Sequence, residues 1–111
     1  MLAKKYILNN KKIFTALKFK GSRIKIGSFL FSFFVNKSEI NNNRFGIIIS
    51  AKAVARASER NRIKRRIRAL LFRFKDQQAQ GQFLDLAIIV LNSPKNNDYS
   101  KLADFLEQKF N

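Results

Sequence analysis

The sequence predicts a single α+β domain, an α-β sandwich in which helices pack against a small sheet. The chain has 111 residues, which is the size of one domain. Short runs of β-branched and aromatic residues alternate with longer segments whose apolar residues recur every three or four positions. We find no internal repeat, low-complexity segment or linker, and therefore expect one domain over residues 1–111.

The first half of the chain predicts a helix followed by strands. In residues 9–20 the apolar residues fall on one helical stripe, and Gly21 follows as a stop signal. The Phe-rich run at 28–35 and the β-branched run at 44–50 predict two strands. An extra strand is possible at 22–26. The polar segment between the two main strands predicts a turn or loop.

The second half predicts a helix, a strand and a final helix. A strongly basic helix begins between Ala53 and Ser58, and the polar loop 76–82 follows it. The apolar run 85–91 predicts a buried strand, and Asp98 is expected to cap the last helix. The expected order is therefore α-β-β(-β)-α-β-α.

The charge of the chain indicates a polyanionic partner. The formal net charge is +16, and such self-repulsion disfavours the compact state unless a partner neutralises it. Residues 1–75 hold twenty of the 23 cations and two of the seven acids, a net charge of +18, whereas residues 76–111 carry −2. We rank nucleic acid first as the partner, an anionic membrane second and a merely solvated basic surface third.

The composition argues against catalytic groups in the protein. The chain has no His and no Cys, so the common general base, the thiolate nucleophile and most zinc sites are missing. The seven carboxylates are scattered without a close pair in sequence. We therefore expect no catalytic residue, no metal site and no organic cofactor in the protein. The missing Cys and the lack of an export signal or long apolar span predict a cytoplasmic protein.

The basic helix divides into an apolar arc and charged flanks. Ile63, Ile67, Leu71 and their apolar neighbours fall within an arc of about 100°, the face expected to pack on the sheet. Cations four residues apart cover the rest of the helix, and like charges at this spacing repel. A helix selected for folding alone would intersperse acids, yet the only acid nearby is Glu59. The repulsion therefore favours a binding surface over a solvated face.

Residue types within the helix favour nucleic acid over membrane. Six of the seven cations between 60 and 73 are Arg, whose planar fork matches phosphate. Asn61 adds an amide suited to a base edge or a 2′-hydroxyl. Phe72 falls on the polar side, where it is either functional or covered by the loop 76–82. A DNA-binding basic zipper would need sustained heptads after the helix, and the apolar pattern ends at Phe74.

The segment "FGIIISAKAVARASERNRIKRRIRALL" closely resembles the signature of the bacterial ribonuclease P protein component. In that family a strand ends in a basic turn and a helix opens with Arg-Asn-Arg, as "RNRIKR" does here. Weaker resemblance extends over nearly all 111 residues. It implies the α-β sandwich with an unusual left-handed βαβ crossover, which the general rule of right-handedness would not suggest.

The resemblance implies two sets of binding residues. The first docks on the catalytic RNA subunit and comprises Arg60, Asn61, Arg62, Lys64, Arg65 and Arg68. The second lines a cleft for the single-stranded 5′ leader of precursor tRNA and comprises Phe14, Lys18, Phe29, Phe31, Lys52 and Arg56. Lys18 stands where the family often has a second aromatic residue. Phe29 and Phe31 share one face of their strand, and the sequence leaves open which face lines the cleft.

The resemblance also implies where the chemistry resides. Removal of the leader from precursor tRNA would be performed by ribonuclease P RNA and the Mg²⁺ ions that it mainly binds. The protein would bind that RNA and the precursor tRNA, with no role at a membrane or on DNA. Two alternatives remain at this point: a structural RNA-binding protein, such as a small ribosomal component, and peripheral membrane binding through the basic helix.

Overall fold

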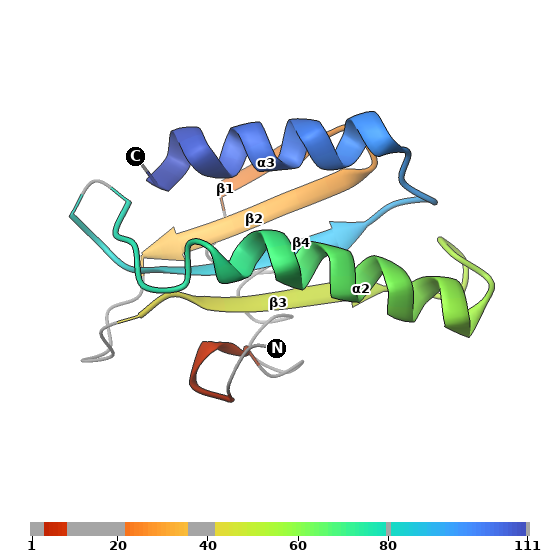
Figure 1. Ribbon diagram of the computed structural model, residues 1–111, viewed down its shortest axis with the longest axis horizontal. Helices are drawn as coiled ribbons and strands as arrows, with labels where there is room; N and C mark the ends of the chain where they lie inside the picture. Colours follow the sequence, from red (N-terminus) through yellow and green to blue (C-terminus); the bar gives the residue numbers. More distant parts are fainter. Residues whose placement is uncertain (1–3, 9–21, 36–41, 80, 111) are drawn as a thin grey trace.

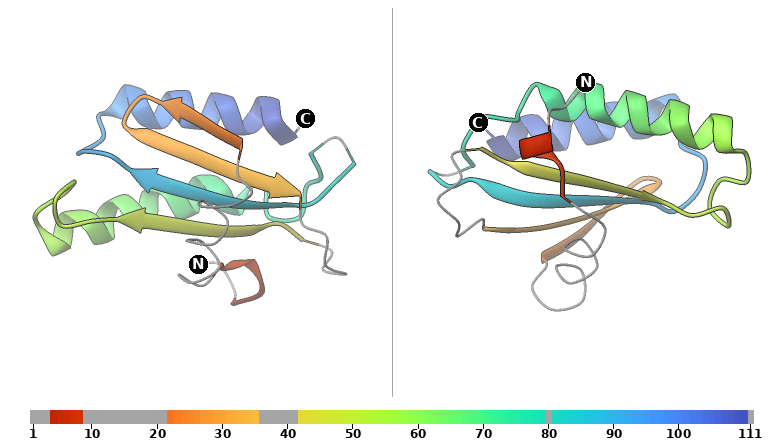
Figure 2. Two further views of the ribbon diagram at one scale, coloured as in Figure 1. Left: turned by 180° about the vertical axis from the view of Figure 1, so that it is seen from behind. Right: turned by 90° about the horizontal axis from the view of Figure 1, so that it is seen from below.

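Within the residues that the structure describes, the chain forms a four-stranded sheet with the helices α2 and α3 on one face (Figures 1 and 2). The computed structural model describes residues 4–8, 22–35, 42–79 and 81–110. Its elements are the 3-10 turn η1 (Lys4–Tyr6), β1 (Ser22–Ile26), β2 (Phe29–Val35), β3 (Arg44–Ile49), α2 (Ala57–Phe72), β4 (Leu84–Val90) and α3 (Asn96–Phe110). The strands lie in the order β1-β2-β4-β3, which is the mixed α+β architecture expected from the sequence.

The connection from β3 to β4 is a left-handed crossover. The two strands are parallel neighbours, and α2 joins them across one face of the sheet. In Figure 1 the helices lie in front of the sheet, both strands point to the right, and β4 lies above β3. About 98% of such connections are right-handed. The resemblance of the signature segment, rather than the periodicity, made this feature predictable.

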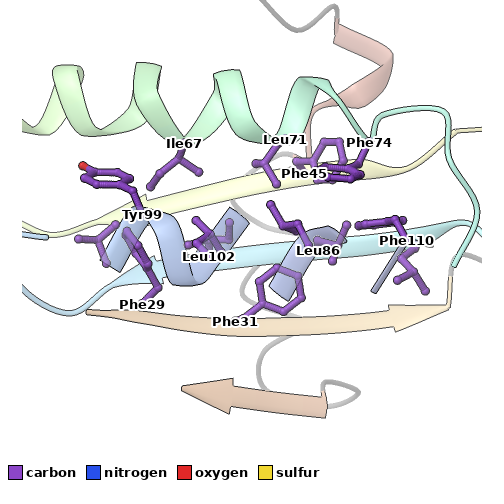
Figure 3. Close-up of a cluster of buried hydrophobic side chains, with 14 of the residues drawn as sticks. Phe29, Phe31, Phe45, Ile67, Leu71, Phe74, Leu86, Tyr99, Leu102 and Phe110 are labelled. Atoms are coloured by element: carbon purple, nitrogen blue, oxygen red, sulfur yellow. The ribbon is translucent and has the colours of Figure 1, made fainter. Parts of the chain in front are cut away.

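The alternation along β2 places its aromatic residues in the core. Phe29 and Phe31 are fully buried and face the helices, as Figure 3 shows. From the other side of the core, Ile67 and Leu71 of α2 are also fully buried. The apolar arc predicted for the basic helix therefore packs on the sheet, and the charged flanks of that helix point away from the core.

One expectation about the start of a helix needs adjustment. Helix α2 begins at Ala57, inside the expected interval, whereas α3 begins at Asn96, before Asp98. Asp98 is therefore not the N-cap residue. Its carboxylate instead accepts the Lys95 backbone N–H at 2.9 Å, the reach-back contact of a capping box. The helix expected at 9–20 lies outside the described residues.

Asn43 holds the chain after α2 against the start of β3. Its side-chain Nδ2 donates to the carbonyls of Phe74 and Gln77, both at 2.7 Å, and its Oδ1 accepts the Leu84 N–H at 2.7 Å. The residue is completely buried. The loop prediction for this stretch missed this role, because the three partners lie more than thirty residues away in the sequence. Asn43 thereby positions the C-terminal end of the basic helix.

Candidate nucleic-acid interface

One charged flank of α2 faces α3 and contacts it through a cation–π interaction, a hydrogen bond and an ion pair. The Arg66 guanidinium lies 3.8 Å from the centroid of the Tyr99 ring and donates to Asn96 Oδ1 at 3.1 Å. Arg73 forms an exposed ion pair with Glu107 at 3.1 Å. Both cations therefore have partners within the fold, although the helical pattern alone does not distinguish them from their neighbours.

Arg60 has a partner in the loop that precedes the helix. Its Nη1 donates to the backbone carbonyls of Val54 and Ala55 at 2.8 and 2.9 Å. We expected Arg60 to contact RNA, and the structure adds a role in holding the loop. That loop carries Lys52 and Arg56, whose side chains are exposed.

The solvent-facing side of α2 forms what we call the outer basic surface, made of Asn61, Arg62, Lys64, Arg65 and Arg68. Within the described part of the chain, none of its four cations makes a hydrogen bond or ion pair. Glu59 lies in the first turn of α2, where its carboxylate accepts the Ser93 hydroxyl at 2.9 Å, and it forms no ion pair with these four cations. The surface concentrates unneutralised charge on one rigid element.

An aromatic and cationic cluster adjoins the C-terminal end of α2. Phe72, the last helical residue, is 47% exposed, and Lys75 Nζ lies 5.1 Å from its ring centroid. The same ammonium lies 4.8 Å from the Tyr6 ring and donates to Asp76 at 3.0 Å. The hydrogen bond to Asp76, and then that to Tyr6, raise the pKa of Lys75. The sequence analysis placed Phe72 on the polar side of the basic helix, but it did not predict that Tyr6 belongs to this cluster.

The expected leader-binding residues do not come together in the described structure. Phe29 and Phe31 are buried against Tyr99 and Phe105 of α3, with ring centroids 5.6 and 4.8 Å apart. Their assignment to an accessible cleft is therefore corrected, because the period-two alternation turns both rings into the core. Lys52 and Arg56 lie on the exposed loop before α2, and Phe14 and Lys18 lie outside the described residues.

Three described carboxylates, those of Asp76, Asp85 and Asp98, have partners within the fold. Asp85 forms a bidentate ion pair with Arg44 at 2.6 and 2.8 Å, which raises the pKa of Arg44. Asp98 accepts the Ser28 hydroxyl at 2.8 Å, and Asp76 accepts the Tyr6 hydroxyl at 3.0 Å. Over the described ranges, no three His, Cys, Asp or Glu residues group closely enough to hold a metal ion. The cations of the outer basic surface are of the residue types that pair with phosphate.

A family model for ribonuclease P matches residues 2–111. The chain belongs to the ribonuclease P protein family. It is 33% identical over 122 residues to the ribonuclease P protein component of Cyanothece sp., covering 97% of this chain and 92% of that protein. It is 35% identical to the Acinetobacter baylyi component, covering 82% and 70% of the two chains. The match to the Synechocystis sp. component is 39% identical but covers only 56% of that protein and 65% of this chain.

Solved ribonuclease P proteins share the fold. The Staphylococcus aureus protein superposes with a TM-score of 0.75 and 25% identity, covering 96% of this chain and 98% of that one. The Thermotoga maritima protein, at 20% identity, superposes with a TM-score of 0.66. Among the described residues of this ribonuclease P family member, no helix is long and apolar enough to cross a membrane.

Proposed function

We propose that this chain is the protein subunit of ribonuclease P, which binds the catalytic RNA and precursor tRNA and promotes removal of the 5′ leader. Membership of the ribonuclease P family supports this function. The observation that carries it is the outer basic surface, where four cations have no neutralising partner among the described residues. A polyanion is the partner that such a surface requires.

We propose that the outer basic surface docks on ribonuclease P RNA. Arg62, Arg65 and Arg68 would contact phosphates through their guanidinium groups, with Lys64 as an added point charge. Asn61 would contact a base edge or a 2′-hydroxyl, because its amide both donates and accepts. Arg60 would act partly through the loop that it holds, and would reach RNA only with the N–H groups that the loop carbonyls leave free.

For the leader of precursor tRNA, we retain Phe14, Lys18, Lys52 and Arg56 as proposed contacts and withdraw Phe29 and Phe31. Lys52 and Arg56 are exposed at the start of the docking helix, so a single strand crossing this loop would meet their charges. Phe14 would supply a stacking surface for a base of the leader.

We assign the cleavage chemistry to the RNA subunit and the Mg²⁺ ions that it mainly binds. The protein contributes by reducing repulsion between two polyanions, which favours both their association and the binding of Mg²⁺. We also propose that the protein acts in the cytoplasm, in keeping with a chain that contains no Cys.

The decisive experiment measures precursor-tRNA cleavage by the cognate RNA subunit at low Mg²⁺, with and without the protein. We expect the protein to stimulate cleavage at the mature 5′ end. The double variant Arg65→Ala/Arg68→Ala should lose most of this stimulation, whereas Lys101→Ala, which removes an exposed cation from α3, should retain it. RNA binding without any stimulation would contradict the proposal and favour a structural RNA-binding protein.

A further inference from the structure

We propose that Phe72 is a stacking platform for an unpaired base of the bound RNA, placed at the C-terminal end of the outer basic surface. This inference rests on the proposed function and extends it, because it adds a contact beyond the Arg-Asn-Arg end of the helix. Phe72 is the one aromatic residue among the exposed large hydrophobic residues of the described chain; the others are Ile7, Ile24, Val35 and Leu91.

The Phe72 ring contacts the ammonium group of Lys75, which is itself fixed by hydrogen bonds to other residues. Lys75 Nζ lies between two aromatic rings, 5.1 Å from the centroid of Phe72 and 4.8 Å from that of Tyr6. The ammonium donates to Asp76 Oδ2 at 3.0 Å and to the Tyr6 hydroxyl at 3.3 Å. Because Asp76 and Tyr6 fix the lysine, one side of the Phe72 ring has a defined neighbour. A base would stack on the opposite side of the ring.

Tyr6 is in turn anchored to the body of the fold. Its side chain is 95% buried, with 5% of its surface exposed, and its hydroxyl donates to Asp76 at 3.0 Å. Asn42 Nδ2 donates to the Lys5 carbonyl at 3.0 Å, which fixes η1 beside the start of β3. Lys5 Nζ lies 5.0 Å from the Tyr6 ring. Cations and rings therefore alternate in the order Lys5, Tyr6, Lys75, Phe72, from the buried Tyr6 ring to the exposed Phe72 ring.

The position of Phe72 on the helix favours a nucleobase over an apolar protein partner. Arg68 and Arg65 precede it by four and seven residues, so all three side chains lie on the same side of α2. A backbone whose phosphates contact these two Arg residues brings its next base to the end of the helix. Proteins that bind single strands combine cations for phosphates with exposed rings for bases in this manner. The only acid in the cluster, Asp76, is paired with Lys75.

The chain contains no Trp, so Phe72→Trp introduces a unique fluorescent probe at the platform. We expect ribonuclease P RNA to quench its fluorescence, because a base stacks on the indole. Parallel titrations with precursor tRNA and with each RNA alone identify which of the two supplies the base. Ile24→Trp, on the edge strand β1, is the matched control and should respond little. Binding of both RNAs without any quenching of the Phe72→Trp signal would overturn the platform.

Affinity provides the second measurement. Phe72→Leu keeps an apolar side chain but removes the ring, and should weaken binding of the RNA identified above by about five-fold or more, since each stacked base is worth roughly 1–3 kcal/mol. Phe72→Tyr should bind like the wild type. The salt dependence should be unchanged in both variants, because no phosphate contact is lost.

Failure of the platform and failure of the proposed function give different results. Unchanged affinity of Phe72→Leu, together with normal stimulation of cleavage, would overturn the platform alone. A wild-type protein that fails to stimulate cleavage would overturn the proposed function, and one that binds neither RNA would overturn both. A loss of affinity in Phe72→Leu with a lowered thermal midpoint, not shared by Phe72→Tyr, would assign the ring to folding and would also overturn the platform.

Discussion

The guanidinium of Arg66 lies 3.8 Å from the centroid of the Tyr99 ring and joins the basic helix α2 to the C-terminal helix α3. The same side chain donates to Asn96 in the first turn of α3. Arg65, the preceding residue, is exposed on the outer basic surface. Adjacent cations on one helix therefore differ in their roles: Arg66 contributes to the fold, and Arg65 is available to a partner.

Replacing Arg66 should affect stability more than RNA binding. Arg66→Ala removes the ring contact and a hydrogen bond at a solvated position, and we expect the free energy of unfolding to fall by about 1 kcal/mol. Urea unfolding measures this change. Arg65→Ala is the control and should stay within about 0.5 kcal/mol of the wild type. Equal losses in the two variants would contradict the division of roles.

Replacing Arg65 should instead alter the salt dependence of RNA binding. If Arg65 contacts one phosphate, Arg65→Ala lowers the slope of log affinity against log salt concentration by about 0.7–0.9. Titrations of ribonuclease P RNA at several salt concentrations give this slope. Arg73→Ala removes a cation that pairs with Glu107 and should leave the slope unchanged. If the slope fell only in Arg73→Ala, the RNA would dock on the flank of α2 that faces α3, and the outer basic surface would not be the docking site.

Asn43 should be among the polar residues most important for stability. Asn43→Ala leaves two carbonyls and one N–H without their side-chain partner, and of the three lost hydrogen bonds those to Phe74 and Leu84 are buried. We expect the free energy of unfolding to fall by about 3 kcal/mol. Chemical denaturation tests this, with the exposed Asn92→Ala as control. A loss below about 1 kcal/mol would mean that water replaces these hydrogen bonds.

Two glycines allow backbone strain to be separated from a steric clash. Gly27 and Gly81 both have positive φ, at 57° and 80°. A Cβ on Gly27 would overlap the Asp98 carboxylate, whereas one on Gly81 would meet open space. We therefore expect Gly81→Ala to lower the free energy of unfolding by about 1 kcal/mol or less, and Gly27→Ala by at least about 2 kcal/mol. Thermal unfolding of both variants decides this, and equal effects would show that the carboxylate simply moves aside.

Asp98 should make stability depend on pH in the acid range. The Lys95 backbone N–H, and then the Ser28 hydroxyl, lower the pKa of Asp98 below its ordinary value. Because the folded pKa is the lower one, the stabilisation is fully present above pH of about 4 and is lost as pH falls through the folded pKa. Unfolding measured across this range should show a steeper acid loss in the wild type than in Asp98→Asn. Parallel curves would indicate that Asp98 titrates normally.

Much of the fold follows from local pattern in the sequence. Six helices and strands besides η1 fall within the described residues, and each was predicted near its observed position, β1 only as a possible extra strand. The core face of α2 was also predicted correctly. In a helix, buried residues recur every three or four positions. The spacing of Ile63, Ile67 and Leu71 therefore identifies the core face of α2, even when the elements that pack against it are unknown. The excess of positive charge also indicates a polyanionic partner without reference to the fold.

The identity of each residue's partner depends on the folded chain. Arg66 meets a residue 30 positions away, Arg73 one 34 positions away, and Tyr6 one 70 positions away. Phe29 and Phe31 were placed in a cleft because the alternation shows that they share a face but not what that face contacts. Hydrogen bonds and ring contacts act over a few ångströms and depend on orientation. Sequence therefore determines which residues are buried or charged, and folding determines which of the cations remain free to bind RNA.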